Sequence, residues 1–147
     1  GSLQANKVKY LVGRVALLHT VDRLELAREI SRRSAQKGVA TAVLLEVNVA
    51  GEASKSGCAP GEAQALAAAV RGLPGLDLRG LMCIPPAEGD PRPHFRTLRA
   101  LRDRLGLAEL SMGMSGDYPA AVEEGATIVR VGTAIFGERP VGGRARP

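Results

Sequence analysis

The 147-residue sequence contains no tryptophan, and aromatic residues make up only 3% of it. Proteins that bind single-stranded nucleic acid stack bases on aromatic side chains, so this composition argues against such a platform. Cysteine and histidine are also scarce: Cys58 and Cys83 form no CxxC pair, and His19 and His94 are the only histidines. These residues match no zinc-ligand spacing and no disulfide framework. We therefore expect reduced thiols and no metal.

Long apolar runs are absent as well. No stretch is long enough to cross a membrane, and the N-terminal residues lack the apolar segment of a signal peptide. The formal net charge is +5, but the basic residues are interleaved with Asp and Glu along the chain. We interpret the densest basic group as the solvated face of one helix and expect no nucleic-acid partner; the group comprises Arg96, Arg99, Arg102 and Arg104. The expectation is a cytoplasmic protein without membrane attachment.

The residues that are abundant suit a parallel sheet covered by helices. Hydrophobic residues make up 45% of the chain, and with so few aromatics the core must come from Ala, Val, Leu and Ile. Short apolar segments alternate with segments of helical periodicity. This alternation predicts a parallel α/β sheet, either doubly wound or part of a barrel. A complete eight-stranded barrel needs about 250 residues, so the barrel interpretation requires further strands. The predicted strands are 15–20, 39–49, 78–84, 109–114 and 127–134, and the predicted helices are a short one within 1–12, then 22–37, 61–71, 91–105 and 117–125.

The last two predicted strands carry small polar residues at or near their ends. The segment 111–115 (SMGMS) closes one of them, and 130–133 (RVGT) lies near the end of the other. Backbone N–H groups and hydroxyls at such strand ends form concavities that bind phosphate. Gly and Ser also close many βα units for reasons of turn geometry alone, so both interpretations stay open at this point.

Arg130 falls within an otherwise apolar strand. Burying a guanidinium is costly unless it is paired, so we expect this side chain to face an anion or an acceptor nitrogen, or to pair with Glu46. Glu46 and Asn48 lie near the end of the longest predicted strand, where α/β proteins gather binding groups. Lys55, in the loop that follows, is either a phosphate contact or a solvated side chain. His19, at a strand end, is interpreted as a hydrogen-bonded core residue rather than a catalyst.

Six blocks of sequence occur in a fixed order over nearly the whole chain: LQANK (3–7), HTVDR (19–23), EASKSG (52–57), LRGLMCIPP (78–86), LSMGMSGD (110–117) and VRVGTAIFG (129–137). Together they closely resemble the pyridoxal-phosphate homeostasis protein family, the single-domain relatives of the alanine racemase barrel. The resemblance implies a (β/α)8-like barrel that binds pyridoxal 5′-phosphate (PLP) without catalytic turnover and buffers or delivers it.

The resemblance also implies a set of cofactor-binding residues. Carried over by motif, Gly113 and Ser115 of MGMS and Gly132 and Thr133 of RVGT form the phosphate side of the site. Arg130 matches the arginine that faces the pyridine nitrogen in the racemase relatives. An always-cationic partner would keep that nitrogen unprotonated and weaken the ring as an electron sink. No catalytic residue is assigned, because the sequence contains no Ser–His–Asp elbow and no P-loop.

One feature departs from the family pattern. The family's imine-forming lysine lies on the first strand, whereas this sequence begins at what resembles the loop after the third strand. The chain's lysines stand at no equivalent position, so covalent attachment of PLP is not expected; they are Lys7, Lys9, Lys37 and Lys55. We expect residues 1–137 to form the C-terminal five or so βα units of the barrel, with 138–147 as a flexible tail.

Such a partial barrel has two open sheet edges. We therefore expect a truncated chain, or one whose edges are covered by a second copy or by a complementary fragment. The alternative function is a barrel enzyme acting on a phosphorylated metabolite, such as a weak amino-acid racemase. In that case another chain would have to supply the lysine and a second acid–base residue.

Overall fold

The fold is described from a computed structural model that covers residues 2–52 and 55–137; the predicted tail, 138–147, lies outside the described residues. Helices and strands alternate along the chain, as the sequence predicts. Their bounds are η1 (Ala5–Lys7, a 3-10 helix), α1 (Val8–Leu11), β1 (Leu18–Val21), α2 (Leu24–Lys37), β2 (Thr41–Glu46), α3 (Ala63–Arg71), β3 (Leu76–Met82), α4 (Arg92–Leu105), β4 (Glu109–Met114), α5 (Tyr118–Glu123), β5 (Ile128–Arg130) and α6 (Thr133–Phe136).

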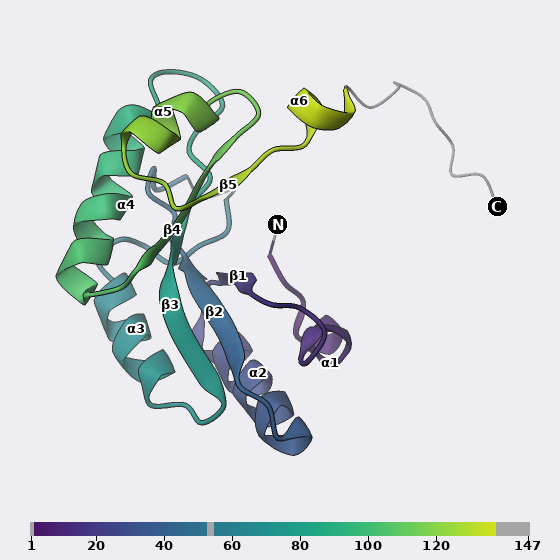
Figure 1. Cartoon of the computed structure of the whole chain (residues 1–147). Helices are drawn as coiled ribbons and strands as arrows, with labels where there is room; N and C mark the ends of the chain where they lie inside the picture. The colour runs from purple at the N-terminus through teal and green to yellow at the C-terminus, as the bar shows by residue number, and fades with distance from the viewer. Residues whose placement is uncertain (1, 53–54, 138–147) are drawn as a thin grey trace.

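The described strands form one parallel sheet in the order β1-β2-β3-β4-β5. Each strand therefore lies beside its predecessor in the chain, which is how successive βα units are arranged in a barrel. Helices α2, α3 and α4 lie along one face of the sheet, and α5 lies beyond them near the end of β4 (Figure 1). The sheet curves away from these helices into a half-barrel, which has an outer, helix-covered face and an inner, concave face.

Helices α2 and α4 form because their apolar residues recur every three or four positions. In α4 this stripe consists of Phe95, Leu98, Leu101 and Leu105, all buried against the outer face of the sheet. Helix α4 ends at Gly106 (φ 61°) and α2 ends at Gly38 (φ 63°), both in the left-handed conformation that glycine adopts most easily. The predicted ends of these two helices, at residues 37 and 105, are confirmed.

The side chains of strand β2 lie alternately on the two faces of the sheet. Val43 and Leu45 belong to the core that packs against the helices, whereas Leu44 is fully buried but lies outside that core. Because side chains alternate along a strand, Leu44 and Glu46 point to the concave face. Every residue of β2 is buried, and its central residues form an apolar run, which explains why the strand was readily recognised.

The last predicted strand is wrong over its second half. Instead of continuing from 127 to 134, β5 ends at Arg130 and helix α6 begins at Thr133. The chain leaves the extended conformation at Gly132 (φ −122°, ψ −74°), and the N–H groups of Gly132 and Ala134 both turn toward the Ser115 hydroxyl. Residues 133 and 134 were included in the strand because a short exposed helix gives no clear periodicity.

The first predicted strand also starts too early. Residues 14 and 15 continue the turn after α1, since the N–H groups of Arg14 and Val15 both donate to the Leu11 carbonyl, and β1 begins only at Leu18. The predicted helix 22–37 also starts too early, because α2 begins at Leu24 and the Asp22 carboxylate pairs with Arg23 at 2.6 Å.

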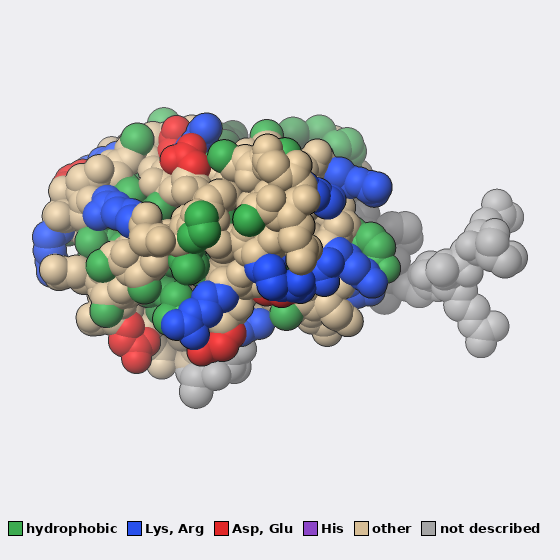
Figure 2. Space-filling model, turned by 90° about the horizontal axis from the view of Figure 1, so that it is seen from below, with side chains coloured by type: hydrophobic (Ala, Val, Ile, Leu, Met, Phe, Trp, Pro, Cys, Tyr) green, Lys and Arg blue, Asp and Glu red, His purple; other side chains and the backbone are tan. Residues whose placement is uncertain are grey.

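Charged residues lie largely in local pairs. On α4, Arg96 and Arg99 contact the Glu124 carboxylate at 2.7 and 3.6 Å. Figure 2 shows Lys and Arg side chains in separate groups on one end of the molecule, with Asp and Glu beside several of them. No helix among the described residues is both long and apolar enough to cross a membrane.

Gly80 permits the close pairing of β3 and β4. A Cβ atom at this position would lie 2.1 Å from the carbonyl oxygen of Glu109, its register partner on β4. We predict that Gly80→Ala lowers the free energy of unfolding by about 2 kcal/mol, because backbone atoms must move to accept the methyl group. Urea denaturation of the variant and the wild type measures the change.

The matched control is Gly72→Ala. Gly72 has an ordinary φ of −79°, and a Cβ there would meet nothing closer than the Ala69 carbonyl oxygen at 3.5 Å. We expect this variant to stay within about 0.5 kcal/mol of the wild type or to gain slightly. Equal stability of the two alanine variants would contradict the steric account.

Candidate phosphate and ring-binding site

The concave face of the half-barrel carries a group of polar side chains. They come from β1, β2, β4 and β5, and comprise His19, Glu46, Ser111 and Arg130. Ser111 is fully buried and Glu46 is only 4% exposed, whereas His19 and Arg130 are half-buried. A sheet that is apolar on its outer face thus has a polar inner face.

Arg130 is the cation of this group. Its Nη1 donates to the Ser111 hydroxyl at 2.7 Å, and its Nη2 donates to the Cys83 carbonyl at 2.9 Å. No carboxylate among the described residues lies within ion-pair distance of it, so it does not form the structural pair with Glu46 that the sequence left open. Burial lowers the pKa of this guanidinium, although an arginine stays cationic at any physiological pH. Its charge therefore lacks a close anionic partner.

His19 reaches the same hydroxyl from the other side. Its Nδ1 lies 2.9 Å from the Ser111 Oγ, although β1 and β4 are separated in the sheet by two strands. Such a contact is possible only because the sheet is strongly curved. Burial lowers the pKa of His19, and the nearby Arg130 charge lowers it further. His19 is hydrogen-bonded, as expected, but it lies half-buried on the concave face and is not part of the core.

Ser115, immediately after β4, joins the ends of the last two strands. Its Oγ accepts hydrogen bonds from the backbone N–H of Gly132 at 3.1 Å and of Ala134 at 3.2 Å. Thr133 lies between these two residues and begins α6. The two segments that the sequence marked as a phosphate cradle are therefore in direct contact. We refer to Ser115, Gly132, Thr133 and Ala134 as the strand-end cradle.

The cradle and Arg130 lie at the same end of the sheet. Met114, the residue before Ser115, is the register partner of Arg130. A Cβ placed on Gly116 or Gly132 would meet no atom within 4 Å, so there is open space beside the cradle. The sequence therefore selected residues that do come together: Ser115, Gly132 and Thr133, with Arg130 two residues before Gly132.

Gly113 occupies a different kind of position. It is buried with a φ of +94°, and a Cβ there would lie 2.6 Å from the Ala121 Cβ and 3.1 Å from the Tyr118 Cα. Its missing side chain allows α5 to pack against the end of β4. Gly113 thus shapes the route of the backbone into Ser115 and remains a predicted cofactor-binding residue only in that indirect sense.

Lys55 and Asn48 organise the loop after β2. The Asn48 amide donates to the carbonyl of Glu52 at 2.8 Å, and Lys55 pairs with the Glu52 carboxylate at 2.8 Å. The Lys55 Nζ also donates to the Pro85 carbonyl at 3.0 Å, which ties this loop to the one after β3. Lys55 is therefore neither a free solvated side chain nor part of the cradle in this conformation.

The two thiols are buried and chemically quiet. Burial raises the pKa of Cys58 to about 11 and that of Cys83 to about 12. A nucleophilic cysteine needs a lowered pKa, so neither thiol is suited to that chemistry. Cys83 contributes its backbone carbonyl to the site instead.

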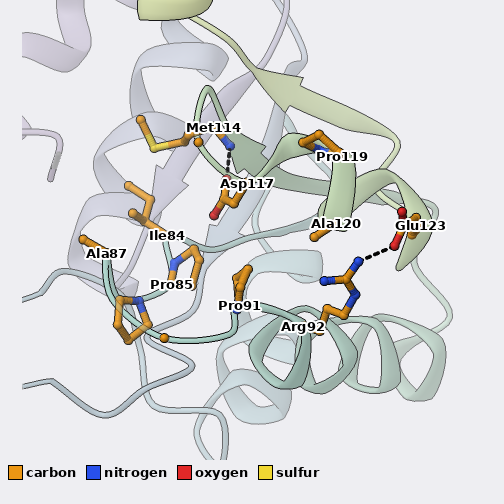
Figure 3. Close-up of a pocket in the computed structure, with 13 residues that line it drawn as sticks. Ile84, Pro85, Ala87, Pro91, Arg92, Met114, Asp117, Pro119, Ala120 and Glu123 are labelled. Carbon is orange, nitrogen blue, oxygen red and sulfur yellow. Dashed lines mark hydrogen bonds and ion pairs between the residues drawn. The ribbon is translucent and has the colours of Figure 1, made fainter.

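A separate hollow of about 600 Å³ lies behind the cradle, between the loop after β3 and the start of α5. Figure 3 shows its apolar wall, which includes Ile84 and Pro85, and the ion pair of Arg92 with Glu123 at its edge. Met114 and Gly116 line this hollow, but Ser115 between them does not. None of the predicted site residues faces it, so it is distinct from the concave face.

With this geometry in place, the protein-family comparison is informative. The family model described as "Alanine racemase, N-terminal domain" matches residues 1–140. The chain belongs to this family. The five-stranded half-barrel therefore corresponds to part of an alanine-racemase-like barrel.

Individual relatives agree with this placement. The pyridoxal phosphate homeostasis protein of Aquifex aeolicus is 50% identical over 148 residues, which cover 95% of this chain and 65% of that protein. The structure of PipY of Synechococcus elongatus with PLP bound is 33% identical, with a TM-score of 0.84 over 93% of this chain and 68% of that one. An alanine racemase of Clostridium difficile is only 16% identical but has a TM-score of 0.75, over 97% of this chain and 39% of that one, which shows the shared fold. The chain spans less than two thirds of the length of the Aquifex relative.

The sequence-based reasoning missed Ser111 as a site residue. Ser111 was available in the SMGMS segment, where it is the one hydroxyl at an inward position of a buried strand. A polar residue there requires partners, and these partners are His19 and Arg130. The Cys83 carbonyl could not have been found, since a backbone group carries no sequence signal.

Glu46 generates a testable prediction about pH. One of its carboxylate oxygens, Oε2, is buried without a hydrogen-bond partner among residues 2–52 and 55–137, and burial raises the pKa of Glu46, as does the carboxylate of Asp22. The folded state thus holds its proton more tightly than the unfolded state, so Glu46 lowers stability as the pH rises from 4.5 through its folded pKa. We predict that Glu46→Gln raises the free energy of unfolding at pH 7 by on the order of 1 kcal/mol and by less at pH 4.

Denaturant unfolding of the variant and the wild type at the two pH values tests this. Glu88→Gln, at an exposed carboxylate, serves as the control and should change little at either pH. A gain for Glu46→Gln that is as large at pH 4 as at pH 7 would show that the ionised carboxylate is not the cause.

Proposed function

We propose that this chain binds PLP non-covalently as a homeostasis protein, a carrier or buffer rather than a catalyst. In this proposal the strand-end cradle holds the phosphate, and Arg130 faces the pyridine nitrogen. The observation that carries it is the convergence of the Ser115 hydroxyl with the N–H groups of Gly132 and Ala134, beside Arg130, which has no close anionic partner in the described part of the chain. The names of the Aquifex relative and of the PLP-bound PipY structure support the choice of ligand.

The residues present fit a phosphorylated pyridine. In this structure the Ser115 Oγ accepts hydrogen bonds from two backbone N–H groups. A phosphate oxygen could accept these hydrogen bonds instead, and the Ser115 hydroxyl could then donate to the same phosphate. Arg130 makes two hydrogen bonds to acceptors among the described residues, one from Nη1 and one from Nη2. Its remaining N–H groups are available to a ligand. When bound, PLP supplies an aldehyde that can condense with amines. The chain's own contribution is to bind and orient the group.

The lysines of the described segment favour a non-covalent carrier. Lys55 is held by Glu52 and the Pro85 carbonyl, and Lys37 donates to the Val12 carbonyl at 2.7 Å. A permanently cationic Arg130 beside the ring nitrogen would also weaken electron withdrawal by the ring, which suits storage better than most PLP chemistry. Racemase-like turnover would require acid–base groups on both faces of the ring, and we assign none.

The binding proposal predicts that removing two hydroxyls of the cradle lowers the affinity for the ligand. The double variant Ser115→Ala with Thr133→Ala should bind both PLP and inorganic phosphate at least about ten-fold more weakly, because charge-assisted hydrogen bonds to the phosphate are lost. Equilibrium titration of each ligand, followed by absorbance for PLP and by calorimetry for phosphate, measures the effect. Thr97→Ala, at an exposed hydroxyl on α4, is the control and should bind like the wild type.

Equal affinity of the double variant and the wild type for both ligands would sink the assignment of the cradle. An imine absorption band that borohydride fixes permanently on one lysine would contradict non-covalent binding.

We further propose that another polypeptide covers the open part of the half-barrel. Strands β1 and β5 each have only one neighbour in the described sheet, and Ile135 and Phe136 on α6 are 68% and 86% exposed. Unpaired strand edges and large apolar side chains favour association. Sedimentation should therefore show a species larger than one chain, and Phe136→Ser should shift the equilibrium toward the single chain. A wild type that stays monomeric at all concentrations would refute this proposal.

A further inference from the structure

A chain of hydrogen bonds crosses the concave face from β1 to β5. It runs from His19 Nδ1 to Ser111 Oγ (2.9 Å) and from there to Arg130 Nη1 (2.7 Å). Arg130 Nη2 ends the chain at the Cys83 carbonyl, 2.9 Å away. Neither His19 nor Ser111 belongs to the strand-end cradle.

The chemistry of the three groups fixes the direction of each bond. A guanidinium can only donate, so the Ser111 oxygen accepts from Arg130. Ser111 is fully buried, and its hydroxyl has no acceptor among the described residues other than His19 Nδ1. A buried hydroxyl without an acceptor is costly, so the Ser111 proton goes to His19.

This arrangement requires one form of the imidazole. His19 must be neutral, with Nδ1 free to accept and its proton on Nε2. The lowered pKa of His19, caused by burial and by Arg130, agrees with a neutral ring at pH 7. A protonated ring would make Nδ1 a donor, and the buried Ser111 proton would then have no acceptor among the described residues.

We propose that His19, acting through Ser111, is a positioning residue that holds the Arg130 guanidinium in the orientation needed to face a ring nitrogen. The inference rests on the proposed function, since it concerns the ring end of the same site. Arg130 has a long, flexible side chain, and the Ser111 oxygen and the Cys83 carbonyl together fix two of its nitrogen atoms and hence its plane. His19 determines which way the serine hydroxyl points, and thereby leaves a lone pair of that oxygen for Arg130.

Positioning of the ring end differs from phosphate binding in its consequences. His19 contacts no part of the strand-end cradle, whose hydrogen bonds come from Ser115. Loss of the His19 acceptor should therefore weaken PLP but not inorganic phosphate. A change that merely loosens the fold would weaken both ligands.

The test compares three variants by titration with PLP and, separately, with inorganic phosphate. His19→Leu removes the acceptor and should weaken PLP binding about ten-fold, the scale of one hydrogen bond to a charged network, with phosphate affinity within about two-fold of the wild type. His19→Asn places an amide oxygen near the position of Nδ1 and should restore most of the PLP affinity. His94→Leu, at the other histidine of the chain, is the control and should change neither affinity.

A second measurement needs no ligand. Nitrogen-15 NMR of the imidazole rings reports the tautomer directly, and the spectrum of His94→Leu identifies the His19 signals because the chain has only two histidines. We expect a neutral His19 ring with its proton on Nε2 at pH 7. In Ser111→Ala the Nδ1 signal should move toward that of a ring without a hydrogen bond.

The outcomes separate the two proposals. A wild type that binds no PLP refutes the proposed function. If the wild type binds PLP, unchanged PLP affinity in His19→Leu, or equal loss of both ligands, overturns the positioning role alone. A proton found on Nδ1 overturns it as well.

Discussion

A guanidinium that is half-buried needs hydrogen-bond acceptors, and the inner face of this half-barrel is arranged to supply them to Arg130. The Ser111 hydroxyl and the Cys83 carbonyl come from β4 and from the residue after β3, so the side chain is held by two neighbouring strands of the sheet. Because no carboxylate of the described residues neutralises it closely, its charge remains directed at the open concave face. Both the strand curvature and the order of the strands are needed for this arrangement.

The outer face follows a simpler rule. There the side chains of β2 and of helices α2 to α4 are apolar, and their burial provides the stability that lets the inner face remain polar. Glycines permit the close approaches this packing needs: Gly80 between β3 and β4, and Gly113 between β4 and α5. Close backbone approaches at these glycines therefore help to determine where the residues of the site lie.

The alternation of strands and helices was predictable, because long apolar strands and helices with left-handed glycine ends give clear signals. Helix α4, with its three- and four-residue spacing and Gly106, was recognised almost to the residue. The short elements were not: β5 and α6 are both exposed and brief, and their boundary depends on the Ser115 hydroxyl, which lies 17 residues before Gly132.

Part of the candidate site was likewise predictable from the sequence, and part was not. Ser115, Gly132 and Thr133 could be named from a resemblance in motif, and they do meet in space. Glu46 could be named as a strand-end carboxylate, but its buried oxygen without a described partner could not. The pair with Arg130 that the sequence left open as an alternative is not formed, because Arg130 donates to Ser111 and Cys83 instead. Contacts across the sheet depend on its curvature, which no local pattern in the sequence encodes.

The bond between His19 and Ser111 joins residues 92 positions apart in the chain. A contact of such long range closes late, because the loop entropy is lost before the contact forms and because β2 and β3 must first pair between its ends. Arg130 then docks onto a hydroxyl that this contact has already oriented. The ring end of the site is therefore complete only when β1 to β4 have all paired, whereas the strand-end cradle needs only the ends of β4 and β5 to meet.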